Sequence, residues 1–176
     1  CALFCLVSLP SIASSIMSDT ESVSKHLNDN KLVLIDMSDD IQYQRFHLVG
    51  AINLPFGTLV TRQKNSSTPI PQDKLIVLLG KLGISNDSHV IIYDDMGGLN
   101  AARLYWELEQ LGHDKVSLMN GGLVKWILEG KPVTNRTPTA VKPTSYVPKK
   151  NERSRLASWQ DVAPASRNKD TVLLDV

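Results

Sequence analysis

The sequence predicts an α/β domain in which a parallel β-sheet is covered by helices on both faces. Short apolar segments alternate with amphipathic helical segments between residues 32 and 130, the order expected of a parallel sheet with crossover helices. The segment 88–94 is apolar through its centre, as expected for a strand buried on both faces. Gly83, Gly112 and Gly130 follow helical segments and mark their expected ends.

The composition is that of an ordinary globular protein and excludes several functional classes. Of the 176 residues 42% are hydrophobic and 21% charged, and the net charge is +1, which argues against disorder and against an integral membrane protein. No run of Lys and Arg forms a basic patch, so we expect no nucleic-acid partner. Only Cys1 and Cys5 carry thiols, so the domain itself is expected to hold no disulfide, no cysteine-ligated zinc and no cofactor.

Residues 1–17 are an apolar run followed by small residues. They resemble the hydrophobic and cleavage regions of a secretory signal whose basic start is missing, with Ser11-Ile12-Ala13 as a rough cleavage site. The apolar part is short and contains Pro10, so we expect no stable membrane span. This pattern predicts a periplasmic or secreted protein; the alternative is a loosely packed N-terminus of a cytoplasmic protein.

The first half of the domain is expected to hold two strands and a short helix. Leu32 to Asp36 is an apolar strand that ends in a carboxylate. Asp39 is expected to cap a helix over residues 40–46. A turn at Gly50 then leads into a small strand that Pro55 stops.

The second half begins with an expected polar loop over residues 57–70. Pro71 and Asp73 then mark a helix start. The expected inward face of this helix is apolar and consists of Leu75, Ile76, Leu78, Leu79 and Leu82. The helix after strand 88–94 has a similar face, made of Ala102, Leu104, Tyr105, Leu108 and Leu111. A strand at 116–119 and a helix up to Gly130 complete the predicted domain.

The candidate site is the loop between the central strand and the next helix, which consists of Asp94, Asp95, Met96, Gly97, Gly98 and Leu99. Ligands of parallel sheets bind beyond the carboxyl ends of the strands, and backbone N–H groups at a helix start suit an anion. A carboxylate there repels anions and is a much poorer sulfur nucleophile than a thiolate. Two adjacent acids are also a weak ligand set for Mg²⁺ or Ca²⁺, so no metal is expected.

Two segments resemble the rhodanese-like sulfurtransferases. The segment "YQRFHLVGAINLP" is similar to the first signature of that family, which in this sequence comprises Tyr43, His47, Gly50 and Ala51. Val49 stands where proline is usual. Val90 to Trp126 resembles the first domain of the two-domain thiosulfate or 3-mercaptopyruvate sulfurtransferases, with strand, loop, helix and the turn Asn120-Gly121-Gly122 in the same order. The resemblance covers most of residues 23–132.

The resemblance implies that Asp94 stands where the second domain of the family carries its catalytic cysteine. This copy would be the non-catalytic half, and the cysteine is expected beyond Val176. The whole protein would move a sulfane sulfur from thiosulfate or 3-mercaptopyruvate to cyanide or a thiol through a cysteine persulfide. The alternative is a catalytically inactive rhodanese-like binding or regulatory module. A phosphatase-like relative ranks lowest, because it needs a cysteine and a basic residue where Asp94 and Asn100 stand.

Two further residues of the resemblance are expected to be structural. Ser38 stands where active copies often carry arginine, so Asp36 is expected to orient or cap the chain. His47 is expected to fix the turn before Gly50, with a general-base role as the less favoured alternative.

The C-terminal part is expected to lead into a second domain. Residues 133–156 contain prolines among Thr, Lys and Asn and are predicted to be an extended linker. Val172 to Val176 align with Val33 to Met37 at an offset of 175 − 36 = 139 residues. We therefore expect residues 157–176 to begin a second, truncated rhodanese-like domain, the partner of residues 18–132.

Overall fold

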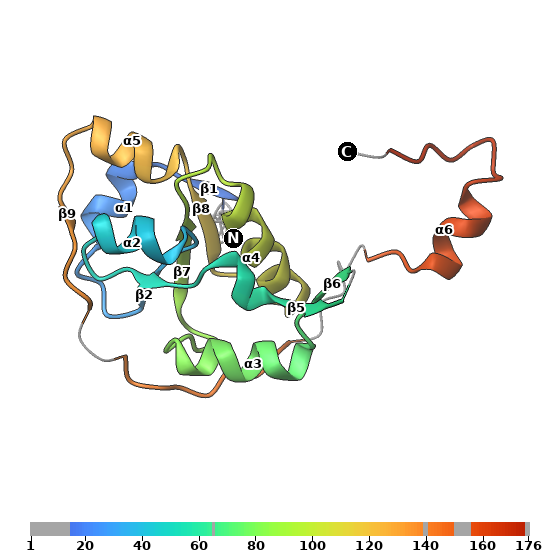
Figure 1. Cartoon of the computed structure of the whole chain (residues 1–176), viewed down its shortest axis with the longest axis horizontal. Coiled ribbons are helices and arrows are strands. Elements are labelled where there is room, and N and C mark those ends of the chain that lie inside the picture. Colours follow the sequence, from blue (N-terminus) through green and yellow to red (C-terminus); the bar gives the residue numbers. More distant parts are fainter. Residues whose placement is uncertain (1–14, 65, 139–140, 150–155, 175–176) are drawn as a thin grey trace, which may run out of the picture.

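A five-stranded parallel sheet forms the centre of the molecule (Figure 1). The computed structural model describes residues 15–64, 66–138, 141–149 and 156–174. The strands, in spatial order, are β1 (Met17–Ser18), β8 (Val116–Met119), β7 (His89–Tyr93), β2 (Leu32–Asp36) and β4 (Ile52–Asn53). All neighbouring pairs are parallel, so the predicted α/β class is confirmed.

Helices cover both faces of this sheet. Alternate residues of the central strand β7 point to opposite faces, as strand geometry requires. Val90 and Ile92 pack in the core with the inward residues of α3 (Gln72–Lys81) and α4 (Leu99–Gln110). Ile91 and Tyr93 pack on the other face with α1 (Thr20–His26) and α5 (Gly122–Leu128). The helix α2 (Asp40–Arg45) begins at Asp39, whose carboxylate accepts a hydrogen bond from the Gln42 N–H at 2.8 Å, as predicted.

The segment 57–70 is not the predicted loop. It contains the 3₁₀ helix η1 (Phe56–Leu59) and an antiparallel hairpin of β5 (Val60–Gln63) and β6 (Ser66–Pro69). The side chains of β6 are exposed, so polar residues suit this strand and the apolar alternation of a half-buried strand is missing. The predicted inward face of α4 was wrong at one residue: Ala101, and not Ala102, is buried.

The end of segment 1–17 takes part in the sheet. Met17 and Ser18 form β1, which pairs with Leu118 and Met119, so Met17 is part of the sheet. Residues 1–14, with Cys1 and Cys5, lie outside the described residues. In the described part of the chain, no helix is long and apolar enough to cross a membrane.

The predicted linker 133–156 is packed on the domain over much of its length. Its first residues form β9 (Val133–Thr134), which pairs antiparallel with β3 (His47–Leu48). Further along, the Tyr146 side chain is 4% exposed and belongs to the core between the sheet, α3 and α4. The segment is therefore extended, as predicted, but it is bound to the surface of the domain.

The helix α6 (Trp159–Ala165) follows this linker. The strand predicted over Val172–Val176 is not formed in its described part: residues 172–174 belong to no strand and are exposed. A strand needs a neighbour to pair its backbone N–H and C=O groups, and no described strand lies beside these residues. Residues 175 and 176 lie outside the described residues.

Candidate functional site: a cradle filled by a carboxylate

The loop after β7 wraps around the carboxylate of Asp94. Oδ1 accepts hydrogen bonds from the N–H groups of Met96 at 3.0 Å and Gly98 at 2.7 Å. Oδ2 accepts from the N–H groups of Asn100 at 2.8 Å and Ala101 at 3.0 Å. Asp94 is 1% exposed, so its charge is balanced almost entirely by these four donors and by the N-terminal end of α4.

Two glycines give the cradle its shape. Gly97 and Gly98 have φ angles of 74° and 98°, a left-handed conformation that glycine adopts without steric cost. Gly98 is the N-cap of α4 and has no side chain that could cap the helix. The carboxylate of Asp94 takes over this role, because it accepts from the first N–H groups of the helix.

The turn Asn120-Gly121-Gly122 closes the cradle from behind. The Leu123 N–H donates to the Asp94 carbonyl oxygen at 3.0 Å. Gly122 has a φ of 55°, and a Cβ at this position would lie 2.4 Å from the same carbonyl oxygen. The strand-end loop and the turn of the segment Val90 to Trp126 therefore meet at Asp94, and their contact requires a glycine.

This arrangement determines what the loop can do chemically. Its N–H donors are directed at an anion, but Asp94 itself supplies that anion. Both carboxylate oxygens face backbone donors, so they are not directed toward a cation or a substrate. Asp95 is half-buried, whereas Met96 and Leu99 are 60% and 69% exposed on the outer side of the loop. No three acidic, His or Cys side chains of the described residues form a metal-binding group.

Asp36 lies fully buried at the end of β2, the strand beside β7. Its Oδ1 accepts from the Ser38 N–H at 2.8 Å. The Asn53 amide donates to the carbonyl oxygens of Asp36 and Ser38, at 3.2 and 3.0 Å. Burial raises the pKa of the Asp36 carboxyl above its usual range, against weaker opposing effects from Ser38, Tyr93 and His47.

Tyr43 and His47 form a stacked pair under the turn at Gly50. Their ring centroids lie 3.7 Å apart, at an interplanar angle of 10°. The Tyr43 hydroxyl donates to the Ala51 carbonyl oxygen at 2.6 Å, and burial raises the Tyr43 pKa to about 12. The His47 ring nitrogens face the carbonyl oxygens of Tyr43, at 2.7 Å, and Arg136, at 3.2 Å. His47 is 1% exposed, so this geometry leaves neither nitrogen open to a substrate.

Several residues of this region carry no signal in the sequence. Tyr93 accepts a hydrogen bond from the Leu48 N–H through its hydroxyl oxygen at 3.0 Å, and burial raises its pKa well above the usual value. Asn53 and Arg136 contribute through an amide and a backbone carbonyl. Such contacts depend on chain segments far apart in the sequence, so no local pattern predicts them.

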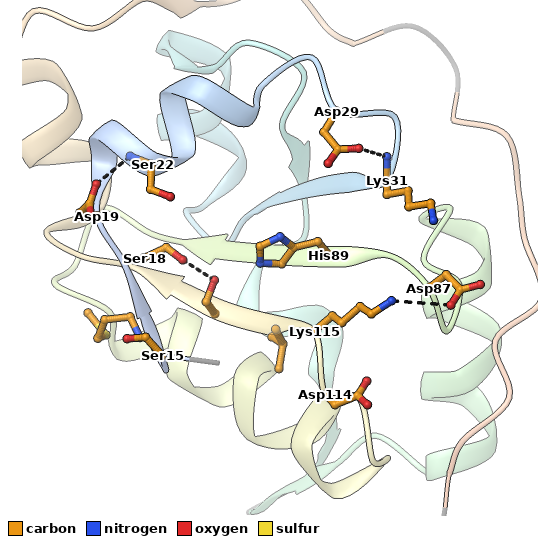
Figure 2. A pocket seen from close by; sticks show the side chains of 13 residues that line it. Ser15, Ser18, Asp19, Ser22, Asp29, Lys31, Asp87, His89, Asp114 and Lys115 are labelled. Carbon is orange, nitrogen blue, oxygen red and sulfur yellow. Dashed lines mark hydrogen bonds and ion pairs between the residues drawn. The ribbon is translucent and has the colours of Figure 1, made fainter. Parts of the chain in front are cut away.

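A hollow lies over β1 and the amino ends of β7 and β8. It has a volume of about 520 Å³ and is lined near the amino ends of β7 and β8 by Lys31, Asp87, His89, Asp114 and Lys115. Figure 2 shows these side chains and the Lys115–Asp87 ion pair, whose N···O distance is 3.7 Å. Burial lowers the pKa of His89. Ser18 and Asp19, at the end of β1, also line the hollow.

Residues 19–129, more than half of the chain, match the family model of the rhodanese-like domain. The chain belongs to the rhodanese-like family. Its fold is the α/β rhodanese fold, with the five-stranded parallel sheet and the six described α-helices.

Two relatives of the rhodanese-like chain are sulfur-handling proteins by name. The sulfur carrier protein TtuD of Thermus thermophilus is 32% identical over 146 residues, which cover 80% of this chain and 49% of that protein. Thiosulfate sulfurtransferase of Rattus norvegicus is 39% identical over 99 residues, which cover 55% of this chain and 33% of that protein. The chain thus spans half or less of the length of these relatives.

Solved structures agree in fold with the rhodanese-like domain. The crystal structure of SseA from Escherichia coli, from work on 3-mercaptopyruvate sulfotransferases, matches with a TM-score of 0.77 and 21% identity. The match covers 88% of this chain and 62% of that one. The 3-mercaptopyruvate sulfurtransferase from Leishmania major matches with a TM-score of 0.69 and 24% identity, over 81% of this chain and 42% of that one.

The raised pKa of Asp36 gives a prediction for the stability of the rhodanese-like domain. A raised pKa means that the folded state binds this proton more tightly than the unfolded state, so the stabilisation is present in acid and is lost as the pH rises through the folded-state pKa. We expect Asp36→Asn, which is neutral at every pH, to increase the free energy of unfolding at pH 7. The gain should shrink toward pH 4 in urea unfolding experiments.

The exposed Asp170 provides the control for this measurement. Asp170→Asn changes the same charge without removing a buried carboxylate, and we expect it to leave the unfolding curve at pH 7 unchanged. A loss of stability in Asp36→Asn at pH 7 would show that the charged carboxylate is favourable where it lies.

Proposed function

We propose that this chain is the non-catalytic half of a two-domain sulfurtransferase. The observation that carries the proposal is the Asp94 carboxylate, which occupies the anion cradle of a rhodanese-like domain through four backbone hydrogen bonds. A thiolate at that position would be a nucleophile for sulfur, whereas a carboxylate is not an effective one. The cysteines of the chain are residues 1 and 5 only.

In the whole protein, a cysteine of the second domain would carry out the chemistry. Its thiolate attacks the outer sulfur of thiosulfate, the S–S bond breaks and sulfite leaves. The resulting persulfide then gives its terminal sulfur to cyanide or a thiol, and the thiolate is regenerated. Backbone N–H groups of an unfilled cradle would stabilise the anionic sulfur. 3-Mercaptopyruvate is the other candidate donor.

The helix α6 supports the proposal that a second copy begins after the linker. It spans residues 159–165, and α1 spans residues 20–26. The offsets are 159 − 20 = 139 and 165 − 26 = 139, the same as that of the strand-like sequences. The N-caps, Ser158 and Asp19, have the same offset. We propose that residues 157–176 are the start of this second rhodanese-like domain and that the two domains are partners.

The exposed side of the cradle supports a second candidate function. Met96 and Leu99 present apolar side chains to solvent beside the filled cradle, where a partner protein would cover them. In this alternative the domain is a catalytically inactive binding or regulatory module. It differs from the first proposal in requiring no catalytic cysteine elsewhere in the protein.

Reading the coding sequence beyond Val176 distinguishes these candidates. The 139-residue offset places the counterpart of Asp94 near position 94 + 139 = 233. A cysteine there, after an apolar strand and before a glycine-containing loop, would favour the sulfurtransferase. A continuation without a thiol, or a stop codon, would favour the binding module. N-terminal sequencing of the protein from its natural source would test export, because export predicts removal of the apolar residues before Met17.

We expect the purified 176-residue chain to have no thiosulfate:cyanide sulfurtransferase activity above the uncatalysed rate. The physical reason is that the cradle holds a carboxylate in place of a thiolate. Thiocyanate formation from thiosulfate and cyanide measures the activity, and the sulfurtransferase of Rattus norvegicus serves as the positive control. Clear turnover by the chain would refute the assignment of this domain as the non-catalytic copy.

A further inference from the structure

The segment 141–149, which we call the strap, lies across the turns that follow α3 and α4. The Thr144 N–H donates to the Gly80 carbonyl oxygen at 2.9 Å, and the Thr144 hydroxyl donates to the Ile84 carbonyl oxygen at 2.8 Å. At the far end, the Lys149 N–H donates to the Leu111 carbonyl oxygen at 2.9 Å. These bonds join the strap to carbonyl groups at the ends of α3 and α4 and just beyond them.

Asn86 holds the middle of the strap. Its amide Nδ2 donates to the Val147 carbonyl oxygen at 2.5 Å, and its Oδ1 accepts from the Val147 N–H at 3.0 Å. Both polar groups of one backbone residue are therefore paired with a single side chain, in the way a neighbouring strand would pair them. Asn86 lies half-buried on the turn before β7 and has no other hydrogen bond among the described residues.

Tyr146 anchors the strap in the core. The side chain is 4% exposed and packs in the cluster that contains Leu79, Ile84 and Leu111. Its ring centroid lies 5.7 Å from that of His113. Burial raises the Tyr146 pKa to about 12. The other strap residues are exposed or half-buried, so one side chain provides most of the apolar contact.

Three glycines of the domain make room for the strap. A Cβ at Gly80 would lie 2.6 Å from the Thr144 carbonyl oxygen, and a Cβ at Gly112 would lie 2.7 Å from that of Lys149. A Cβ at Gly83 would lie 2.6 Å from a side-chain carbon of Val141. All three approaches are too short for a real side chain. The strap therefore comes this close to the domain at three separate points, and at each of them the position is a glycine.

We propose that residues 141–149 form a releasable strap, held on the surface of the domain by Tyr146 and Asn86. While the strap is bound, its last described residue, Lys149, is held at Leu111. When the strap is released, its residues become part of the tether between the domain and α6. The longer tether lowers the effective concentration, at the surface of the domain, of the part of the chain that follows it. The consequence for a second domain rests on the proposed function, whereas the docking and release of the strap do not. The strap is joined to the domain by one core side chain, five hydrogen bonds and the Lys149–Asp114 ion pair. The partners in these hydrogen bonds and in the ion pair lie outside the sheet strands, so we infer that the strap opens while the sheet stays folded.

Chymotrypsin cleavage measures this opening in the full chain. The bond after Tyr146 is protected while the strap is bound, whereas the bond after Trp159, a residue that is 76% exposed, reports cleavage that needs no opening. We expect Asn86→Ala to accelerate cleavage after Tyr146 by about tenfold, since it removes two hydrogen bonds. Cleavage after Tyr105, inside α4, should not change. The matched control is Asn30→Ala, which replaces an exposed asparagine that is not among the hydrogen-bond partners of the strap.

Gly80→Ala shows whether the strap is bound, because the unfolding temperature should rise only if the strap is unbound. Gly80 lies within α3, where alanine is ordinarily the more stable residue. With the strap bound, the added methyl group meets the Thr144 carbonyl, so cleavage after Tyr146 should accelerate and the unfolding temperature should not rise. An increase of several degrees with unchanged cleavage would show that the strap is not bound in solution.

Two further results would overturn the proposal. One is cleavage of the wild-type chain after Tyr146 as fast as after Trp159, which would mean that the segment is unprotected. The other is equal acceleration after Tyr146 and Tyr105 in Asn86→Ala. That result would mean that the segment opens only when the whole domain unfolds.

Discussion

Asp94→Ala is expected to lower the free energy of unfolding of the chain by about 3 kcal/mol or more. The substitution leaves four N–H groups without the acceptor that they now share, and water can replace it only by entering a site that is 1% exposed. It also removes the group that caps α4 at Gly98. Urea unfolding followed by circular dichroism measures the loss.

The control for this prediction is Asp95→Ala, one residue further along the same loop. Asp95 is half-buried and accepts no hydrogen bond from the described residues, so we expect a change within about 0.5 kcal/mol. Equal effects of the two substitutions would show that the four hydrogen bonds contribute little.

An anion should partly rescue the alanine variant. With the carboxylate absent, the cradle has converging N–H donors at a helix start, a geometry that binds oxyanions. Sulfate or thiosulfate is expected to raise the unfolding temperature of Asp94→Ala above that in chloride of equal ionic strength, and to raise it less in the wild type. Equal shifts in the two proteins would mean that the emptied cradle does not bind anions.

Gly122→Ala is expected to destabilise the chain by about 2 to 4 kcal/mol, from two separate causes. The φ of 55° is costly for a residue with a side chain, and the new Cβ would meet the Asp94 carbonyl oxygen at 2.4 Å. A backbone carbonyl cannot move aside without disturbing β7 or the hydrogen bond from Leu123. The measurement is again urea unfolding.

Gly130→Ala separates these two causes. Gly130 has a similar φ of 68°, but no atom lies within 4 Å of the position of a Cβ there. We expect this variant to lose about 1 kcal/mol, the cost of the left-handed backbone alone. Equal losses in the two variants would mean that the turn relaxes and that the contact with Asp94 is not constrained.

Some of the site could be predicted because the relevant signals are local. The order of strand, glycine-containing loop and helix around Asp94 is visible in the sequence, and backbone geometry then directs N–H groups into the loop. The orientation of the carboxylate could not be predicted. An aspartate at the mouth of a cradle can face solvent or turn inward, and the choice depends on how closely the turn at Gly122 packs behind the loop.

The sequence alone determined the fold class, the central strand β7, the helices α3 and α4 and the position of the candidate loop. These follow from hydrophobic periodicity and helix-end residues, which act over a few neighbouring positions. Only the tertiary structure decided that Met17 joins the sheet, that Arg136 meets His47 and that Tyr146 enters the core. Such contacts join residues far apart in the sequence, and their free energy depends on the shape of a surface that forms only when the chain has folded.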